Sequence, residues 1–220
     1  MSRPVNPPLS LTERRKAATQ LDIAQAAAEL FTEQGPDGTT AEEIAGRAGV
    51  ALRTFYRYFR NKQDAVGPLL STGGARWREL LAATEPGTPL PRALEAAAVA
   101  SLSQPGEAAA EALRWTRGLL RAAQDDPALR AVWYRVNQES EERLLPVVAR
   151  LVDPATDELE LRLIAAAATD AIRVSLEVWA ASDADVAGPG SPADLVARAL
   201  GGAAHRVAAP GSGTPAATAP

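Results

Sequence analysis

The sequence predicts an all-α fold. Alanine dominates the apolar residues and aromatic residues make up only 5% of the chain, so a strong helix former fills the places where a sheet would use Val, Ile, Tyr or Phe. Proline and glycine separate long segments of helical periodicity, and no β-hairpin signal interrupts them. With 220 residues the chain can form one large or two small domains.

The first helix is predicted to begin after Ser10. Ser10-Leu11-Thr12-Glu13 has the pattern of a capping box, in which a hydroxyl and a carboxylate each satisfy a free backbone N–H at the helix start. Gly35-Pro36 should end this helix. Its apolar positions recur at helical spacing: Ile23, Ala27, Leu30 and Phe31.

Three shorter helices are expected next. A second capping box at Thr40 opens a helix that carries Ile44 and Ala45, and Gly49 ends it. A third helix should run over residues 51–59. Asn61 can cap a fourth, with Lys62 in its first turn and Asp64 near its positive end.

Six longer helices are predicted beyond residue 64, each bounded by turn residues. Residues 1–9 and 210–220 have little to bury, and we expect a disordered arm and a disordered tail there. The longer helices are expected at 65–83, 91–103, 106–124, 127–151, 156–181 and 192–208.

The stretch from Thr40 to Lys62 has the pattern of a helix-turn-helix. Gly49 suits a turn with positive φ between two crossed helices. If Phe55 marks the buried direction of the third helix, steps of 100° place Arg53 and Arg57 nearly opposite it. An exposed helix with Arg53, Thr54 and Arg57 can enter a major groove, where Arg can donate two hydrogen bonds to a guanine edge.

The flanking groups suit phosphate oxygens rather than base edges. Tyr56 and Tyr58 each carry a hydroxyl donor, and Thr40 and Lys62 stand at helix starts, where free N–H groups favour anions. Arg14, Arg15 and Lys16 either touch the DNA backbone or a minor groove, or are simply solvated. The sequence leaves both possibilities open.

The net charge of −4 does not argue against DNA, because the charge is distributed unevenly. Residues 1–62 carry a balance of +2 and residues 63–220 a balance of −6. The stretch 47–62 contains no acid and five basic residues: Arg47, Arg53, Arg57, Arg60 and Lys62. It predicts a local electropositive patch.

These residues resemble the DNA-binding domain of the tetracycline-repressor (TetR) family. The resemblance covers roughly residues 14–66 and rests on three segments: Ala-Ala-Ala-Glu-Leu-Phe at 26–31, Thr-Thr-Ala-Glu-Glu-Ile-Ala-Gly-Arg-Ala-Gly-Val at 39–50, and Thr-Phe-Tyr-Arg-Tyr-Phe with Asn-Lys at 54–62. The family commonly has Ser, Gly and His where this chain has Ala51, Arg53 and Tyr58. Without the Ser the recognition helix loses a cap, and Arg53 adds a bidentate donor.

The resemblance implies a three-helix head at residues 10–64 and a larger helical body at 65–209. In such proteins the body senses a small-molecule effector and forms a homodimer through its last two helices, and the effector releases the repressor from a palindromic operator. The family's DNA contacts map to Thr40, Arg53, Thr54, Tyr56, Tyr58 and Lys62. A DNA-binding dimer that senses nothing, and is controlled by protein partners or abundance, is the alternative.

The body offers no effector motif, so its effector-binding residues are unknown. Aromatic side chains that either line a pocket or fill the core are Trp115, Trp133, Tyr134 and Trp179. Arg114, Arg117 and Arg121 indicate a salt-bridged face, with an anionic effector as the alternative. Asp170 and Arg173 form a partly buried pair or face a partner subunit. The segment 159–181 is apolar over more of its circumference than one interior face requires, which favours dimerisation.

The composition argues against enzymes and membrane proteins. There is no Cys and one His, His205, which has no Ser or Asp at motif spacing, so we expect no catalytic residues, no metal site and no cofactor. No apolar run approaches the roughly 18 residues of a membrane span, and the N-terminus lacks the apolar core of a signal peptide. We therefore expect a cytoplasmic protein.

Overall fold

The computed structural model describes the backbone of residues 10–208 and the side chains up to residue 201. Within that range it contains α-helices, one 3-10 helix and no strand, which confirms the all-α prediction. The elements are α1 (Leu11–Gly38), α2 (Ala41–Arg47), α3 (Leu52–Tyr58), the 3-10 helix η1 (Asp64–Val66), α4 (Gly67–Ala82), α5 (Leu90–Leu102), α6 (Glu107–Ala122), α7 (Pro127–Val148), α8 (Glu158–Ala181) and α9 (Pro192–Ala208). The expected disordered segments 1–9 and 210–220, and the side chain of His205, lie outside the described residues.

Helix α1 starts and stops as its end signals predict. Ser10 Oγ accepts from the N–H of Glu13 at 3.2 Å, and Glu13 accepts from the N–H of Ser10 at 2.8 Å. At the other end the regular helix breaks at Gly35, whose φ of 77° is a conformation that favours glycine. Pro36, which has no N–H to donate, follows this break and begins a last short turn that extends to Gly38.

The connection between α2 and α3 is a tight turn at Gly49, where φ is 66°. The N–H of Val50 returns to the carbonyl of Ala45 at 2.9 Å and closes the turn. Ala51, at the start of α3, makes no side-chain cap hydrogen bond, as expected for a position without a hydroxyl.

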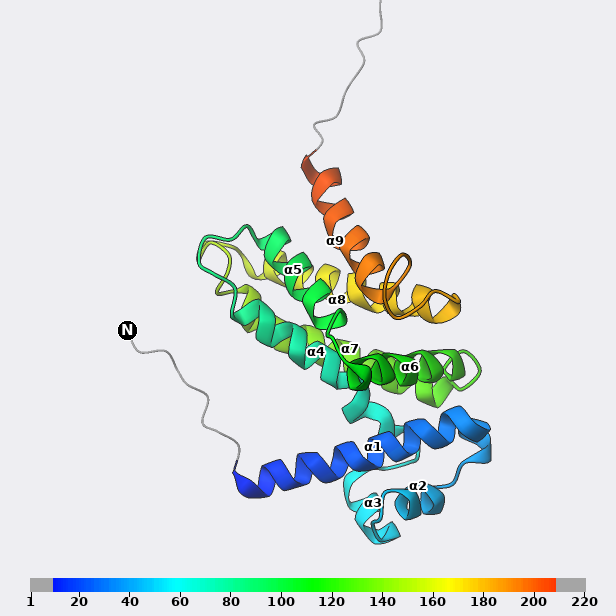
Figure 1. Cartoon of the computed structure of the whole chain (residues 1–220). Helices are drawn as coiled ribbons and strands as arrows, with labels where there is room; N and C mark the ends of the chain where they lie inside the picture. Colours follow the sequence, from blue (N-terminus) through cyan, green and yellow to red (C-terminus); the bar gives the residue numbers. More distant parts are fainter. Residues whose placement is uncertain (1–9, 209–220) are drawn as a thin grey trace, which may run out of the picture.

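The helices form two stacked groups (Figure 1). The long helix α1 lies across one end of the molecule, with α2 and α3 beneath it. Helices α4, α6 and α7 lie on its other side, and α5, α8 and α9 form the far end, where α9 packs against α5 and α8. Because α1 also packs against α6, it joins the two groups.

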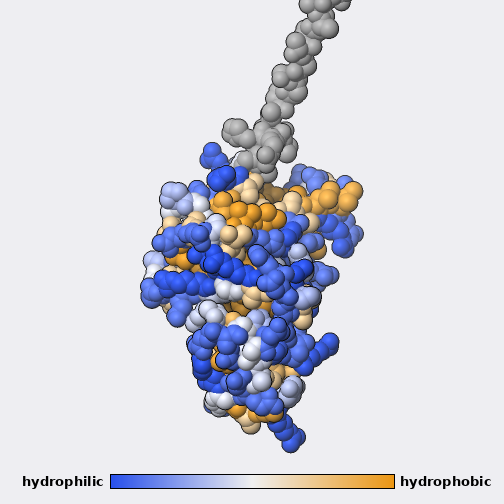
Figure 2. All heavy atoms as spheres, turned by 90° about the vertical axis from the view of Figure 1, so that its right-hand side faces the viewer, coloured by the Kyte–Doolittle hydropathy of each residue, from blue (hydrophilic) through white to orange (hydrophobic). Residues whose placement is uncertain are grey.

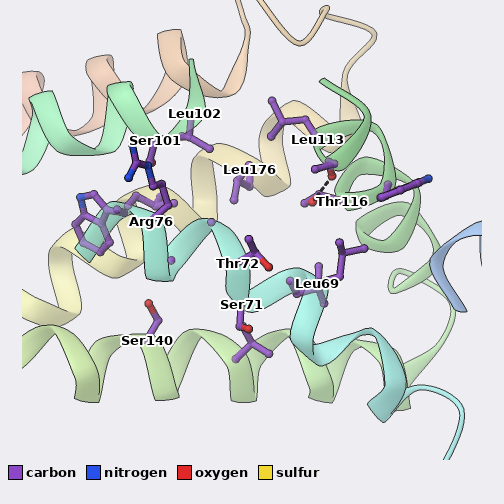
Figure 3. Close-up of a pocket in the computed structure, with 18 of the residues that line it drawn as sticks. Leu69, Ser71, Thr72, Arg76, Ser101, Leu102, Leu113, Thr116, Ser140 and Leu176 are labelled. Atoms are coloured by element: carbon purple, nitrogen blue, oxygen red, sulfur yellow. Dashed lines mark hydrogen bonds between the residues drawn. The ribbon is translucent and has the colours of Figure 1, made fainter. Parts of the chain in front are cut away.

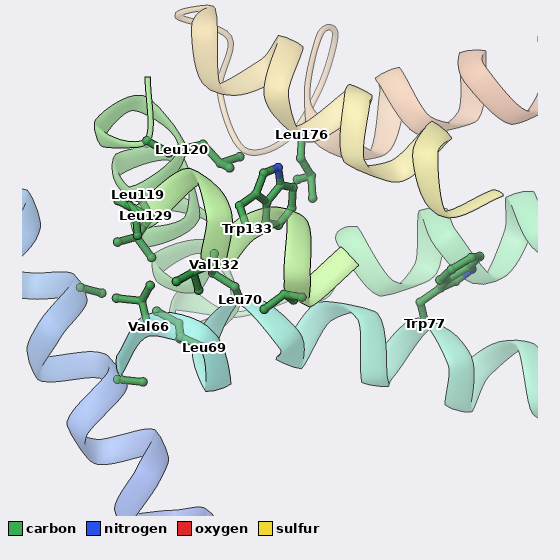
Figure 4. Close-up of a cluster of buried hydrophobic side chains, with 14 of the residues drawn as sticks. Val66, Leu69, Leu70, Trp77, Leu119, Leu120, Leu129, Val132, Trp133 and Leu176 are labelled. Atoms are coloured by element: carbon green, nitrogen blue, oxygen red, sulfur yellow. The ribbon is translucent and has the colours of Figure 1, made fainter. Parts of the chain in front are cut away.

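The body is held together by large apolar side chains from α4, α6, α7 and α8 (Figure 4). Trp77, Leu119 and Leu129 are almost completely buried. Each such side chain contributes roughly 1.5–3 kcal/mol of transfer free energy when it leaves water.

The body helices agree with the predicted segments to within a few residues, with two instructive differences. The fourth element begins as a 3-10 turn at Asp64–Val66 before α4, and Asn61 Oδ1 caps it by accepting from the N–H of Asp64 at 2.8 Å. Helix α7 ends at Val148 rather than at residue 151, because the chain tightens there: the N–H of Arg150 donates to the carbonyl of Val147 and that of Leu151 to the carbonyl of Val148.

Candidate nucleic-acid interface and internal cavity

Helix α3 separates a buried face from an exposed one. Phe55 is fully buried and Phe59 nearly so, with ring centroids 5.6 Å apart. Arg53 and Arg57 are exposed, and so is Tyr56, with 55% of its surface accessible. Thr54 and Tyr58 are half-buried at the sides of the helix. The exposed face therefore carries two guanidinium groups and one phenol.

Arg57 does not extend freely into solvent. Its Nη2 donates to the Tyr58 hydroxyl at 3.2 Å, and its guanidinium lies 4.8 Å from the centre of the Tyr58 ring. A shallow basic hollow joins this pair to the first turns of α1 and is lined by Thr12, Arg15, Lys16, Thr19, Arg57 and Tyr58. Arg15 and Lys16 thus lie close to α3 in space. The sequence predicted the helix that carries them but not this proximity.

Thr40 at the start of α2 is engaged in a complete capping box. Its Oγ1 accepts from the N–H of Glu43 at 3.2 Å, while its N–H and Oγ1 both donate to Glu43 Oε2, at 2.7 and 2.9 Å. These hydrogen bonds lower the pKa of Glu43. A phosphate that met the Thr40 hydroxyl would have to compete with this carboxylate.

Lys62 lies against the junction of α1 and α2. Its Nζ donates to the carbonyl of Thr39 at 3.0 Å, so it stands next to Thr40 although 22 residues separate them. An ammonium has three donors, and the contact with Thr39 uses one of them.

Arg47 is not part of the basic surface that the sequence suggested. It forms ion pairs with Glu33 at 2.9 Å and Glu29 at 3.3 Å, both on α1. Hydrogen bonding to Arg47 also lowers the pKa of Glu33. The run without acids from 47 to 62 is therefore partly neutralised in space by residues that are distant in sequence.

The body contains a cavity of about 430 Å³, which lies within the range of roughly 300–1,000 Å³ common for small-molecule sites. Side chains from α4, α5, α6, α7 and α8 converge on it (Figure 3). Leu21 and Gln25 of α1 also line it, so the helix that supports α2 and α3 contacts the cavity directly.

The structure divides the four candidate aromatic residues into two groups. Trp115 and Trp133 line the cavity, and Trp133 Nε1 donates to Glu177 at 2.8 Å. Trp179 is fully buried away from it, with Nε1 bonded to the carbonyls of Ala184 and Asp185. Tyr134 is exposed at 51%. Trp77 also lines the cavity, although no motif in the Ala-rich body marks it as a candidate.

The three arginines of α6 have different roles. Arg114 pairs with Glu107 at 2.6 Å on an exposed face, as predicted. Arg117 lies 4.0 Å from the Trp179 ring and donates to the Ala184 carbonyl, whereas Arg121 donates to the carbonyl of Ala180 at 2.7 Å. Cations bind free carbonyls well at a helix C-terminus, so these two hold the end of α8 and the turn that follows it.

Asp170 and Arg173 form a pair at 2.9 Å in which Arg173 is largely buried and Asp170 is exposed, and Arg173 also bonds Glu177 at 3.0 Å. Its guanidinium lies 5.6 Å from the Tyr134 ring. Arg173 therefore links α8 to α7.

Helix α8 also carries a row of exposed apolar side chains. Leu159, Leu163, Val174 and Val178 are 46–68% accessible, and steps of 100° place them within about 100° of one another. On the face shown in Figure 2, apolar residues gather mainly toward the α8–α9 end, and the α1–α3 end is mostly hydrophilic.

No helix between residues 10 and 208 is both long and apolar enough to cross a membrane.

Comparison with known proteins identifies relatives of this chain. Residues 23–66 match the model of the family described as bacterial regulatory proteins, tetR family. An HTH-type transcriptional repressor of Mycobacterium tuberculosis, Rv3405c, is 36% identical over 89 residues, which make up 38% of this chain and 47% of the relative. The HTH-type transcriptional regulator TcmR of Streptomyces glaucescens is 30% identical over 142 residues, 63% of this chain and 62% of the relative. The chain thus spans about half to two thirds of the length of these curated relatives.

Solved structures of similar fold cover more of the chain. A TetR-family transcriptional regulator from Mesorhizobium loti matches 86% of this chain and 96% of its own, with 21% identity and a TM-score of 0.53. The repressor FadR of Thermus thermophilus, in complex with lauroyl-CoA, matches 90% of this chain and 100% of its own, with 22% identity and a TM-score of 0.51. At this identity the likeness concerns the fold.

Proposed function

We propose that this chain, whose residues 23–66 match the model of the tetR family of bacterial regulatory proteins, is a sequence-specific DNA-binding transcriptional regulator that acts as a repressor. The observation that carries this proposal is the geometry of α3 within the matched segment. Its buried face is anchored by Phe55, and its exposed face presents Arg53, Tyr56 and Arg57. A helix of this kind can lie in a major groove and contact base edges and phosphates.

The site residues divide by chemistry into base readers and phosphate contacts. Arg53 makes no ion pair with the described side chains, and its guanidinium suits the O6 and N7 atoms of guanine, with Thr54 and Arg57 beside it. Tyr56, Tyr58, Lys62 and Thr40 lie around this face and suit phosphates. Arg15 and Lys16 extend the same basic surface along α1.

The DNA-binding unit would comprise residues 10–64 and the effector-binding and dimerisation unit residues 65–209. We expect two copies to associate through the apolar row on α8, because a second subunit would remove those exposed leucines and valines from water. Two heads related by a two-fold axis would then read a palindromic operator with half-sites on one side of the duplex.

The cavity in the body supports control by a small-molecule effector over the alternative of a DNA-binding dimer that senses nothing. Its lining includes Leu21 and Gln25 of α1, so an occupant would touch the helix on which α2 and α3 pack. Binding that favours one placement of α1 would then shift affinity for DNA. The fold relative FadR was solved with lauroyl-CoA bound.

Selection of bound sequences from a random duplex pool tests the proposal. The full-length protein should recover one palindromic motif, and a variant with Arg53→Ala should recover a motif with one degenerate position in each half-site. Recovery of no motif, with equal retention of all duplexes, would contradict sequence-specific regulation.

A further inference from the structure

The charged groups around the cavity are mostly positive. Three arginines line it, Arg76, Arg78 and Arg143, against one carboxylate, Glu111, which is exposed at the rim. Arg76 pairs with Glu79 at 3.5 Å and Arg143 with Glu139 at 3.0 Å. The cavity therefore favours an anionic occupant.

Arg78 differs from the other two because no carboxylate among the described side chains comes within ion-pair distance of it. It is half-buried on α4, and its Nη1 donates to Ser140 Oγ of α7 at 2.9 Å. A guanidinium has five N–H donors, so this bond leaves most of them without an acceptor among residues 10–201. Burial, and then the charge of Arg143, lowers the pKa of Arg78, as expected for a cation that lacks its counter-ion.

Gly74 leaves the space in which Arg78 contacts Ser140. A Cβ at Gly74 would lie 2.9 Å from Ser140 Oγ and 3.3 Å from Arg78 Nη1. A glycine within a helix costs about 1 kcal/mol relative to alanine, and here it leaves room for the hydrogen bond between α4 and α7. The arginine is thus held at the cavity by a specific arrangement rather than by chance.

Two further cavity residues have buried polar atoms without a partner among the described residues: Trp77 Nε1 and Thr169 Oγ1. Both residues are more than nine-tenths buried. Buried donors without partners are costly, so these atoms favour a ligand that brings oxygen acceptors over a pure hydrocarbon.

The rest of the lining combines uncharged polar side chains, among them Ser71, Thr116 and Asn137, with a larger apolar part. The apolar part is formed chiefly by leucines and tryptophans from five helices, among them Leu69, Leu102, Leu113, Trp115, Trp133 and Leu176 (Figure 3). Such a surface binds an apolar body of drug-like size.

We propose that the cavity binds an amphipathic carboxylate, with its carboxylate at Arg78 and Ser140 and its apolar body among the leucines and tryptophans. The inference rests on the proposed function, since it names the chemical class of the effector. A planar guanidinium is well suited to a carboxylate because it can donate two parallel hydrogen bonds.

The test compares acids with their uncharged amides on the full-length protein. Naphthalene-2-carboxylate is matched with naphthalene-2-carboxamide, and decanoate with decanamide, so that ring-shaped and chain-shaped bodies are both sampled. Trp115 and Trp133 line the cavity, and their fluorescence reports binding. We expect at least one acid to bind about tenfold more tightly than its amide, because it adds charge-assisted hydrogen bonds.

Three variants assign the preference to Arg78. Arg78→Gln should reduce the affinity for the acid about tenfold, toward that of the amide, and Arg78→Lys should keep part of the preference because it keeps the charge. Arg92→Gln removes an exposed guanidinium of α5 outside the cavity and should change nothing. Thermal unfolding of each variant shows whether it is folded.

Three results would overturn the inference: equal affinities of acids and amides, a full acid preference in folded Arg78→Gln, or no binding of any of the four compounds. None of these measurements uses DNA. Their failure is therefore distinct from failure of the duplex selection, which tests the proposed function without any ligand.

Discussion

Gln63 Nε2 donates to Asp126 Oδ2 at 2.9 Å and so joins the segment after the helix-turn-helix to the start of α7. Asp126 also caps α7, because its Oδ1 accepts from the N–H of Leu129 at 2.9 Å. Further along α7, Arg135 donates to Asp64, the residue after Gln63, at 2.6 Å. These contacts tie the DNA-binding end to a helix that lines the cavity.

Removal of the Asp126 carboxylate should cost more stability than removal of its partner. Gln63→Ala deletes one hydrogen bond and should lower the free energy of unfolding by about 1 kcal/mol. Asp126→Ala deletes the same bond and the cap of α7, and should cost about 2 kcal/mol. Urea unfolding measures both, and equal losses would contradict a double role for Asp126.

The contribution of Asp126 should depend on pH. Burial opposes its ionisation, but the hydrogen bonds from Gln63 and from the α7 backbone outweigh this and lower its pKa. A carboxyl whose pKa is lower in the folded protein stabilises the fold above its unfolded pKa, near 3.9, and this contribution is lost as the pH falls through the folded value. Asp126→Asn should therefore lose less stability than the unmodified protein between about pH 4 and pH 2. Urea unfolding at several pH values measures the free energy of unfolding of both proteins. If it fell equally with pH in the two proteins over that range, this prediction would be refuted.

Arg53→Ala should change specificity more than general affinity. The lost bidentate contact should cost about 1–3 kcal/mol at one base pair in each half-site and leave binding to other sequences nearly unchanged. Competition binding to the selected operator and to single-base variants measures the difference. A uniform loss on every duplex would mean that Arg53 contacts phosphate.

Lys62→Ala should weaken binding to all duplexes alike. The slope of log K against log salt concentration should fall by about 1 per subunit, because one phosphate contact is lost. Lys62 also bonds the Thr39 carbonyl, so a thermal unfolding curve must accompany the binding data. Arg92→Ala, remote from α3, is the control, and a loss confined to one sequence would argue for base contact by Lys62.

Leu163→Glu should prevent dimerisation. Leu163 lies in the exposed row of α8 and is 60% accessible, and a carboxylate there would be desolvated by a partner subunit at high cost. Sedimentation at micromolar concentration should show a dimer for the unmodified protein and a monomer for the variant. Leu11→Glu alters a similarly exposed leucine on α1, 56% accessible, and should remain dimeric. If both variants remain dimeric, the α8 row is not the interface.

The end signals of the helices could be predicted from sequence because each acts over three or four residues. The capping boxes of Ser10 and Thr40 and the Asn61 cap join atoms three residues apart, and Gly35 and Gly49 have the positive φ that their turns need. The periodicity of α3 likewise predicted the buried Phe55 and the exposed Arg53, since both follow from 3.6 residues per turn.

The cavity could not be predicted in this way. Trp115 and Trp179 look alike on Ala-rich helices, yet one lines the cavity and the other is buried beside the turn after α8. Gly74 within a predicted helix is one available signal of a close approach, because glycine lowers helix stability and a Cβ there would lie 2.9 Å from Ser140 Oγ.

The helix boundaries and the division of α3 into a buried and an exposed face were thus determined by the local sequence. The partners of the charged side chains and the lining of the cavity were determined by which helices pack together. Arg47 finds its acids 14 and 18 residues away on α1, and Arg78 meets Ser140 62 residues away on α7. Such partners are joined only when the chain has folded, because hydrogen bonds and ion pairs act over a few ångströms in space and no periodicity of the sequence specifies them.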